Sequence, residues 1–170
     1  LAVVAEVGVR GMVGRGEHAP VLAEVGAHRD ALAEEQGAAE VEAVFDLAIK
    51  EYGRLDILVN NAGIYFPKMA LDLTEDEWER MIHTNLKGQF LCAQRAAKEM
   101  QKNKWGRIIN ISSIAGWHSD TGGGGQAAYA ACKAGIMGFT RATAAEVGQY
   151  GIRVNAIAPC TIYNDFLGKI

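Results

Sequence analysis

Cysteine is scarce in the sequence, long apolar runs are missing, and charges of one sign do not gather. The three cysteines are odd in number and widely spaced, so they fit neither a disulfide framework nor a zinc site, and we expect reduced thiols. No apolar run is long enough to cross a bilayer. The formal net charge of -3 gives no basic surface for nucleic acid. These features predict a cytoplasmic protein that binds no nucleic acid, no membrane and no metal ion.

Helical and strand-like patterns alternate along the 170 residues, of which 49% are hydrophobic. A chain of this size can bury one substantial core, so we expect a single domain over residues 1–170. The alternation favours a parallel sheet covered by helices, the α/β class. The patterns predict helices over 41–52, 86–100 and 130–147, a helix after the capping box of Thr74 and Glu77, and strands over 55–59, 108–111 and 154–158.

Tyr129 and Lys133 stand four residues apart at the start of the last of these helices. Side chains with this spacing project from one helix face, so the ammonium can lie beside the phenol. Moving a tyrosine pKa from ~10 to about 7 takes roughly 4 kcal/mol. A charge at about 4 Å supplies roughly that much at an effective dielectric of about 20. The pair is therefore a candidate proton donor and acceptor, although the spacing alone also fits a snorkelling lysine beside an interfacial ring.

Four further blocks accompany this pair in a fixed order. They read DILVNNAG at 56–63, TNLKG at 84–88, GRIINISS at 106–113 and VNAIAP at 154–159, with YAACK at 129–133 before the last of them. In this order the blocks resemble the short-chain dehydrogenase/reductase family, and the resemblance covers about residues 39–165. It implies a doubly wound parallel sheet of the Rossmann type, in three layers α/β/α. It also implies an oxidoreductase that uses NAD or NADP to interconvert a secondary alcohol and a ketone.

The same resemblance assigns catalytic roles to four residues. Tyr129 would donate and accept the proton, and Lys133 would lower the phenol pKa and bind the nicotinamide ribose. Ser113 would hold the substrate oxygen through a hydrogen bond. Ser112 is its rival, because strand alternation puts the two serines on opposite faces and only one can face the cofactor; alignment with the family favours Ser113. Asn85 would hold a water that connects Lys133 to solvent, and its alternative role is an ordinary helix cap.

Cofactor contact is expected where strands end, because open parallel sheets bind ligands at their carboxyl edge. The resemblance assigns this contact to Asn60, Asn61, Ala62 and Gly63 after one strand, to Pro159 and Ile162 after another, and to Tyr129 and Lys133. The family's usual glycine after that proline is Cys160 here, and its later threonine is Asn164. These two changes alter the expected geometry of the nicotinamide pocket, although Asn164 still offers an amide.

A glycine cluster near the amino terminus is the candidate phosphate-binding loop. It consists of Gly8, Gly11 and Gly14, between an apolar stretch at 1–7 and another at 21–27. The outer spacing matches the family motif Gly-x-x-x-Gly-x-Gly, but the middle glycine is displaced. An ordinary turn is the alternative. Pro20 falls inside the helix that the loop should start, where it removes a backbone donor.

The second and third strands of the family are not found in the sequence. Only helical patterns stand between residue 28 and residue 55. The residues that choose between NAD and NADP are therefore not located, although Arg10 hints at the 2'-phosphate of NADP. After Asp165 the chain nearly stops, whereas relatives continue with a substrate lid and a last strand. We hypothesise that the sequence is an incomplete record of a longer protein, which the mass of the intact protein tests.

The resemblance also implies partners. It predicts a homodimer or homotetramer, with the helices that begin near Asn85 and Tyr129 at the subunit interface. The substrate is an alcohol or ketone of open identity, because similar enzymes reduce sugars, polyols, steroids, small ketones and acyl-carrier 3-ketones. The likeness is to the group of 3-oxoacyl-carrier-protein reductases and sugar dehydrogenases. The altered glycine cluster motivates an alternative, a nucleotide-binding protein that senses the cofactor without catalysis.

The segment 117–126, between Ser113 and Tyr129, is longer than in close relatives. Its glycines at 122–125 cost entropy to order, so we expect mobility without ligand. Loops at the mouth of a rigid site often set substrate choice. We hypothesise that Trp117 and His118 approach the substrate; the alternative is an exposed insertion unrelated to chemistry.

Overall fold

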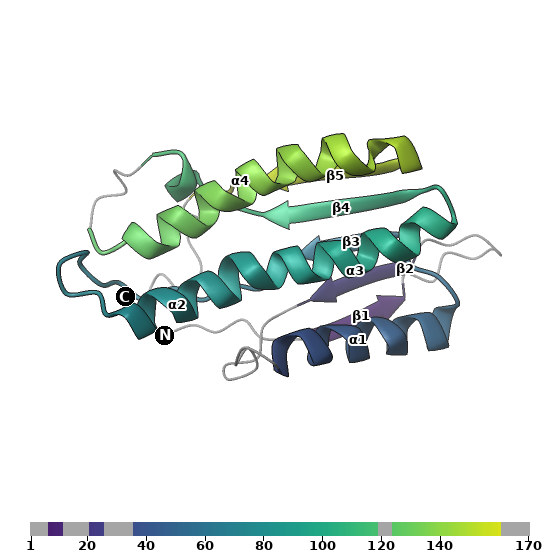
Figure 1. Cartoon of the computed structure of the whole chain (residues 1–170), viewed down its shortest axis with the longest axis horizontal. Coiled ribbons are helices and arrows are strands. Elements are labelled where there is room, and N and C mark those ends of the chain that lie inside the picture. Colours follow the sequence, from purple (N-terminus) through teal and green to yellow (C-terminus); the bar gives the residue numbers. More distant parts are fainter. Residues whose placement is uncertain (1–6, 12–20, 26–35, 119–123, 161–170) are drawn as a thin grey trace.

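Among the residues that the structure describes, five strands form one sheet whose order follows the sequence. In the computed structural model the described residues are 7–11, 21–25, 36–118 and 124–160, with side chains described from residue 38 onward. The strands are β1 (Val7–Gly11), β2 (Val21–Val25), β3 (Ile57–Asn60), β4 (Gly106–Ile111) and β5 (Ile152–Ile157) (Figure 1). β2, β3, β4 and β5 are parallel neighbours, and β1 pairs with the outer edge of β2 in the antiparallel direction.

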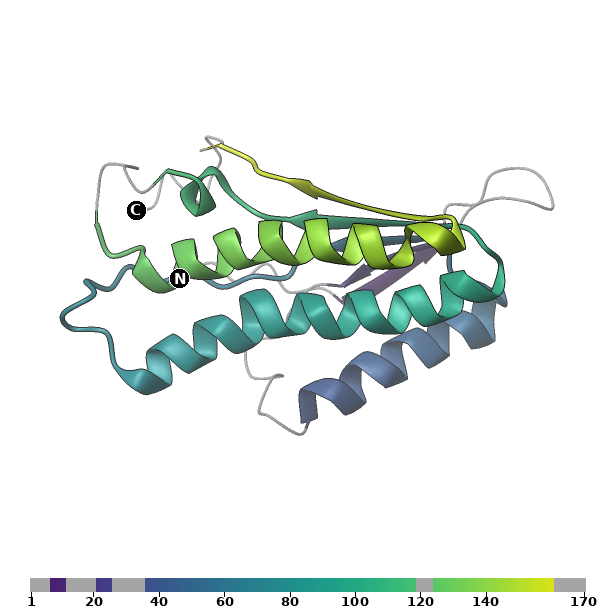
Figure 2. The ribbon, with the colours of Figure 1, turned by 45° about the horizontal axis from the view of Figure 1, so that its top comes forward.

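The three long helices lie on one face of this sheet. The helical elements are α1 (Gln36–Tyr52), α2 (Glu75–Ile82), the π-helical η1 (His83–Lys87), α3 (Gly88–Lys102), the short η2 (Ile114–Gly116), α4 (Ala127–Val147) and the short η3 (Gly148–Tyr150). α1 packs on β1 and β2, α3 on β3 and β4, and α4 on β4 and β5. Figures 1 and 2 show them side by side along the sheet. The described part of the chain thus holds the sheet and one helical layer.

Two helix boundaries form as the sequence predicts. α1 stops before Gly53, which has a φ of +74° and whose N–H donates to the Ile49 carbonyl at 2.8 Å; glycine adopts this backbone without strain. α2 begins behind a capping box: the Glu77 N–H donates to the Thr74 hydroxyl at 3.2 Å, and the Thr74 N–H donates to the Glu77 carboxylate at 3.0 Å. These local bonds satisfy backbone groups that a helix end leaves open.

The core fills the space between the sheet and the helical layer. Alternate residues of the central strands are buried, so Leu58, Ile108 and Val154 face the helices. Phe45 of α1 and Met100 of α3 pack onto them. Burying a side chain of this size contributes roughly 1.5–3 kcal/mol. This cluster therefore anchors the strands whose carboxyl ends carry the candidate site.

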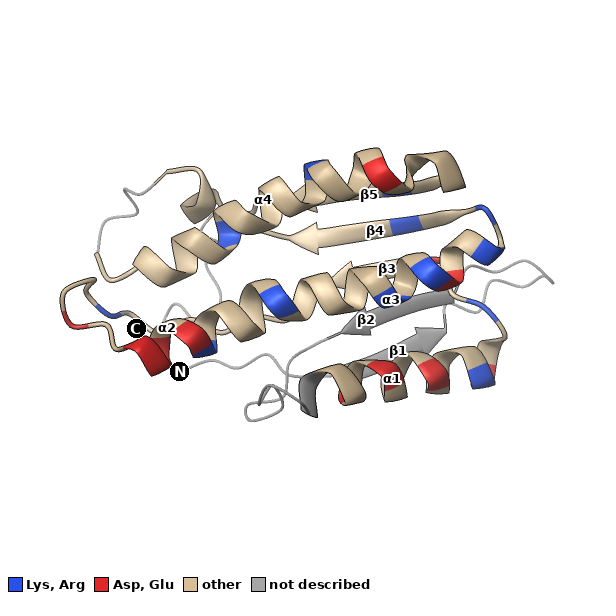
Figure 3. Ribbon diagram, in the orientation of Figure 1, with Lys and Arg blue, Asp and Glu red and all other residues tan. Residues whose placement is uncertain are grey.

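Arg95 joins α3 to α1 through charge. Its guanidinium donates to Glu42 at 2.6 Å and Asp46 at 2.9 Å on α1, and to Glu99 on its own helix at 2.6 Å. Burial acts to raise the pKa of the Glu99 carboxyl, but the bonds from Lys102 and Arg95 outweigh it and lower that pKa. Figure 3 shows the acidic residues along α1 in red and basic residues on α3 in blue. The network fixes how the two helices lie against each other.

The amino-terminal strands differ from the sequence prediction. The glycine cluster is not followed by the expected helix at the apolar stretch, because residues 21–25 form β2, parallel to β3. Valines at both ends of this segment are β-branched and favour extended backbone. Gly8 and Gly11 lie inside β1 and pair with β2. They therefore do not form the expected loop between a strand and a helix, and Gly14 lies outside the described residues.

β2 is a strand that the sequence analysis missed before α1. Doubly wound sheets that bind dinucleotides commonly run in the strand order 3-2-1-4-5-6, with a reversal at the ligand crevice. The described strands run in sequence order, without that reversal. The ligand edge that they do present is formed by the carboxyl ends of β3, β4 and β5.

Candidate active site

The segments that carry the sequence motifs meet at one edge of the sheet. Because β3, β4 and β5 are parallel, their carboxyl ends point to the same side, where η1, η2 and the first turns of α4 also lie (Figure 1). The sheet thus gathers blocks that are far apart in the sequence.

Asn85 ties the π-helix η1 to the segment that follows β3. Its side chain is fully buried; its Oδ1 accepts from the Ile64 N–H at 2.7 Å, and its Nδ2 donates to the Ile64 carbonyl at 2.8 Å. The regular α-helical ladder is interrupted here, since η1 has π-helical bonds. The alternative role as a helix cap is wrong, because His83 caps α2 and Lys87 precedes α3.

Gly63 leaves room beside these groups. A Cβ at this position would lie 3.1 Å from Asn85 Oδ1 and 3.9 Å from Lys133 Nζ. The first contact is tighter than ordinary packing, so a side chain here would crowd the amide. Only glycine keeps the space next to the lysine ammonium open.

Lys133 is buried at the centre of the site. Its side chain extends from α4, only 4% of the residue is exposed, and its Nζ donates to the Ile111 carbonyl at 2.8 Å. The Nζ also lies 5.4 Å from the centroid of the Tyr129 ring. Burial lowers the pKa of the ammonium to about 8, partly opposed by attraction to the Cys132 thiol. A lysine with this pKa loses its charge within reach of physiological pH.

The Tyr129 phenol does not show the lowered pKa that the sequence predicts. Burial raises its pKa, and a hydrogen bond with Ser113 opposes that rise. The physical reason is that desolvation disfavours the phenolate, while the Lys133 ammonium is engaged by the Ile111 carbonyl. Proximity of the two side chains is as expected, but in this structure the tyrosine stays protonated at neutral pH.

The two serines face opposite ways, as strand alternation predicts. Ser112 is buried, and its Oγ donates to the Lys133 backbone carbonyl at 2.7 Å. Ser113 is half-buried, its Oγ accepts from the Ala115 N–H at 3.1 Å, and its hydroxyl acts on the Tyr129 phenol by opposing the rise of the Tyr129 pKa. Ser113 rather than Ser112 therefore lies beside the phenol, and Ser112 fastens the end of β4 to α4.

Gly116 ends the turn η2 directly against α4. A Cβ at Gly116 would lie 2.6 Å from the Ala134 nitrogen and 2.9 Å from the Lys133 carbonyl oxygen. These are backbone atoms, which cannot move aside as a flexible side chain can. The absence of a side chain at Gly116 thus sets the distance between the turn after Ser113 and the helix that carries Lys133.

The residues at the end of β3 and in the turn after it differ in how accessible they are to a ligand. Asn60 is buried, and its Nδ2 donates to Asn110 Oδ1 at 2.8 Å and to the Gln89 carbonyl at 3.2 Å. It therefore holds β3 to β4 and α3. Asn61 is exposed, while Ala62 and Gly63 are half-buried. These last three are open to contact with a ligand, whereas the Asn60 side-chain amide is engaged within the protein.

Sequence reasoning missed three neighbours of the site. Asn110 continues the chain of buried bonds by donating to Thr140 Oγ1 at 3.0 Å, and its signal was a polar residue inside an apolar strand. Gln89 donates to the Ile111 carbonyl at 3.3 Å. Tyr65 packs edge-on against Tyr129, with ring centroids 5.1 Å apart. Neither Gln89 nor Tyr65 carried a pattern that could have marked it.

The remaining candidates lie at the rim or outside the described residues. Pro159 is half-buried, and its carbonyl accepts from the Ile114 N–H at 3.0 Å, so it borders the turn η2. Cys160 is exposed. Ile162 and Asn164 lie outside the described residues. Trp117 is 77% exposed and stacks on His118.

A parallel α/β sheet that carries a half-buried tyrosine, a buried lysine and a serine at its carboxyl edge defines the Rossmann-type class of dinucleotide-binding proteins. The family model described as short chain dehydrogenase matches residues 17–170, and the chain belongs to this family. Among the helices that the structure describes, none is long and apolar enough to traverse a membrane.

Individual relatives share about half of their length with this chain. The 3-oxoacyl-acyl-carrier-protein reductase FabG of Staphylococcus aureus (strain Mu50) is 44% identical over 126 residues, which are 74% of this chain and 50% of that protein. Subunit BbsD of a hydroxy(phenyl)methylsuccinyl-CoA dehydrogenase from Thauera aromatica is 46% identical over 125 residues, 74% of this chain and 49% of that protein. The chain thus spans about half the length of the curated relatives that it matches.

A similar solved structure confirms the fold class. A variant of ElxO solved with NADPH bound has a TM-score of 0.72 and 35% identity, over 78% of this chain and 52% of that one. The predicted doubly wound, three-layer α/β/α fold of the Rossmann type is therefore confirmed, and the chain covers part of it.

Proposed function

We propose that the protein is an NAD(P)-dependent oxidoreductase, with one dinucleotide-binding domain, that interconverts a secondary alcohol and a ketone. One observation carries the proposal: Tyr129 lies beside the buried Lys133 at the carboxyl edge of the sheet, with Ser113 acting on its phenol. Membership of the short-chain dehydrogenase family supports it.

In this proposal the side chains move a proton and orient an oxygen. Tyr129 gives its phenolic proton to the carbonyl oxygen during reduction and takes one from the alcohol during oxidation. The raised pKa of Tyr129 suits the donor role, because the phenol is protonated at neutral pH. Ser113 donates a hydrogen bond to the same oxygen. The Lys133 ammonium has three N–H groups and donates one to the Ile111 carbonyl. The other two remain for the nicotinamide ribose and for the region of the Tyr129 phenol.

NAD or NADP is the proposed cofactor, and it supplies the hydride when bound. The residues at the nicotinamide end fit such a group, because Gly63 keeps the space beside Lys133 and Asn85 free of a side chain. The NADPH bound to the similar ElxO variant supports this assignment. The described residues do not present a glycine loop for the phosphates. An assay with both cofactors therefore has to determine whether the protein uses NAD or NADP.

A steady-state assay tests the proposal. Purified protein is offered NADH and NADPH with a panel of sugars, polyols, steroids, small ketones and acyl-carrier or CoA-linked 3-ketones, the last included because of the two relatives. We expect turnover of at least one ketone. The alternative, a sensor that binds the cofactor without catalysis, predicts cofactor binding by fluorescence titration and no turnover on any member of the panel.

Tyr129→Phe is the matched variant for this assay. It keeps the ring that packs on Tyr65 and removes only the hydroxyl. We expect kcat to fall by several orders of magnitude while cofactor affinity stays close to wild type, because only the proton transfer is lost. Retention of more than about a tenth of the wild-type kcat would remove Tyr129 from the acid–base role.

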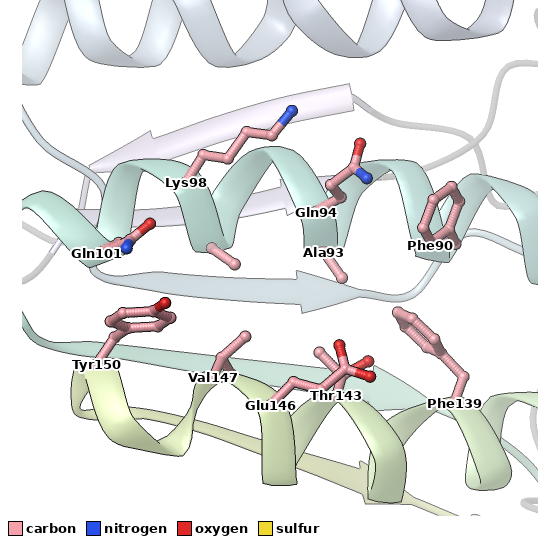
Figure 4. Close-up of a pocket in the computed structure, with 11 residues that line it drawn as sticks. Phe90, Ala93, Gln94, Lys98, Gln101, Phe139, Thr143, Glu146, Val147 and Tyr150 are labelled. Atoms are coloured by element: carbon pink, nitrogen blue, oxygen red, sulfur yellow. The ribbon is translucent and has the colours of Figure 1, made fainter.

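We also propose that α3 and α4 form the interface of a homodimer or homotetramer. A cavity of about 220 Å³ lies between these helices and is lined by Phe90, Ala93, Gln94, Ala97, Lys98, Gln101, Phe139, Thr143, Glu146, Val147 and Tyr150. Figure 4 shows side chains of both helices converging on it. Phe90 is 41% exposed and meets Phe139 edge-on. An aromatic pair of which one ring is exposed, beside small residues, is a suitable surface for a second copy.

Analytical ultracentrifugation tests the interface. Phe90→Glu places a charge in the cavity, so we expect a lower sedimentation coefficient than wild type at equal concentration. Leu47→Glu on α1 is the control, because Leu47 is similarly exposed but does not line the cavity. If the Phe90→Glu variant assembles as wild type does, the cavity between α3 and α4 is not part of the subunit interface. The cytoplasmic location stays a prediction from the sequence.

A further inference from the structure

Two side chains from different helices donate to one backbone carbonyl. Lys133 Nζ of α4 reaches the Ile111 oxygen at 2.8 Å, and Gln89 Nε2 of α3 reaches the same oxygen at 3.3 Å. A carbonyl oxygen has two lone pairs. Both are therefore occupied, and the end of β4 is the point where the candidate lysine and Gln89 meet.

Gln89 is held rigidly in this place. It is 1% exposed, and its backbone carbonyl accepts from Asn60 Nδ2 at 3.2 Å. The amide orientation is determined by chemistry, since only the NH₂ end can donate to a carbonyl. The other end, Oε1, is buried and has no hydrogen-bond partner among the described residues. A desolvated oxygen without a partner costs stability, whereas an apolar side chain of equal length would not.

We propose that Gln89 is a positioning residue for the Lys133 ammonium, acting through the Ile111 carbonyl that both side chains bind. Gln89 occupies one lone pair and confines the lysine to the other. The remaining N–H groups of Lys133 then keep a fixed direction. This role explains why a stability cost is retained at a buried site, and it rests on the proposed oxidoreductase function of Tyr129 and Lys133.

The titratable groups around Lys133 come from α4 and from the segment after β3. Tyr129 and Cys132 are its neighbours on α4, and Tyr65 packs on the ring of Tyr129. None of these is a carboxyl. A change at position 89 therefore acts on the lysine with little competition from a nearby negative charge.

Gln89→Met and Gln89→Glu test the proposal through different measurements. Methionine keeps the length and volume but donates nothing; we expect kcat to fall roughly tenfold, with an unchanged or higher Tm. Glutamate places a carboxylate near Lys133, because the two nitrogens that share one oxygen are at most about 6 Å apart. At this separation we expect the lysine pKa to rise by roughly one to two units.

Heteronuclear NMR of labelled lysine follows the Lys133 titration directly, without any need for activity. Gln149→Met is the control, because Gln149 also donates to a backbone carbonyl but is exposed at the far end of α4. A Lys133 titration and kcat in Gln89→Met that match Gln149→Met overturn the proposal. A lower Tm with an unchanged titration also overturns it, because Gln89 would then be only a structural tie. Wild-type protein without turnover refutes the proposed function, yet the titration still decides the role of Gln89.

Discussion

Removal of the Asn85 amide should destabilise the fold strongly, although Asn85 belongs to no hydrophobic cluster. The side chain bonds both backbone groups of Ile64, at 2.7 and 2.8 Å, and is fully buried. In Asn85→Ala the Ile64 N–H and carbonyl lose these partners. Leaving a buried polar group unpaired costs about 1–3 kcal/mol, so two such groups cost about 2–6 kcal/mol.

Helix propensity offsets only a little of this loss. Alanine is better than asparagine in a helix by roughly 0.7 kcal/mol or less, so the net expected loss is on the order of 1.5–5 kcal/mol. For a total stability of about 5–15 kcal/mol, such a loss is large. With a urea m-value of about 2 kcal/mol/M, the midpoint of unfolding should fall by roughly 0.8–2.5 M.

Urea unfolding followed by circular dichroism measures this difference. Asn103→Ala is the control, because Asn103 is exposed at the end of α3 and surface changes usually stay within about 0.5 kcal/mol. A midpoint for Asn85→Ala within error of the Asn103→Ala variant would refute the reasoning. It would mean that the segment after β3 finds other hydrogen-bond partners when the amide is removed.

Three further predictions concern charge, backbone and loop. Because the pKa of Lys133 is lowered to about 8, the folded state loses this proton at a lower pH than the unfolded state does. The free energy of unfolding of wild type, measured in urea, should therefore rise by on the order of 3 kcal/mol relative to Lys133→Met between about pH 8 and 10.5. The same pH dependence of stability in both proteins would contradict this. Gly151→Ala should lower Tm more than Gly53→Ala: both have positive φ, which costs roughly 1–2 kcal/mol, but only at Gly151 would the Cβ meet the Lys104 carbonyl. Deleting 122–124 should change kcat/KM ratios across the ketone panel, and unchanged ratios would show that the loop does not set specificity.

The carboxyl-terminal two thirds of the fold was predictable because its signals are local. The capping box at Thr74 and the glycine after Tyr52 act within a few residues. The apolar pattern of residues 106–111 is itself enough to indicate a buried strand. β1 and β2 were not predictable. Short strands depend on pairing with distant segments rather than on their own sequence, and a glycine cluster that suggests a turn can equally lie in a strand.

The candidate site also has parts that could be predicted from the sequence and parts that could not. Spacing placed Tyr129 and Lys133 on one helix face, and alternation separated Ser112 from Ser113. The direction of the Tyr129 pKa was wrong, because spacing gives no information on burial, and burial dominates here. The shared carbonyl at Ile111 is a tertiary contact between three elements. No pattern along the chain encodes it.

The two glycines that flank the segment 117–124 make it a replaceable unit. Gly116 lies against the α4 backbone, and the Gly125 carbonyl accepts from the Lys68 N–H at 3.0 Å. Each end is thus fastened by main-chain atoms, whose positions do not depend on which side chains stand between them. Loop grafting could exploit this: we expect that segments of other lengths and compositions can be spliced between the two glycines while the register of α4 is preserved. A library built in this way would sample substrate preference without first having to rescue the fold.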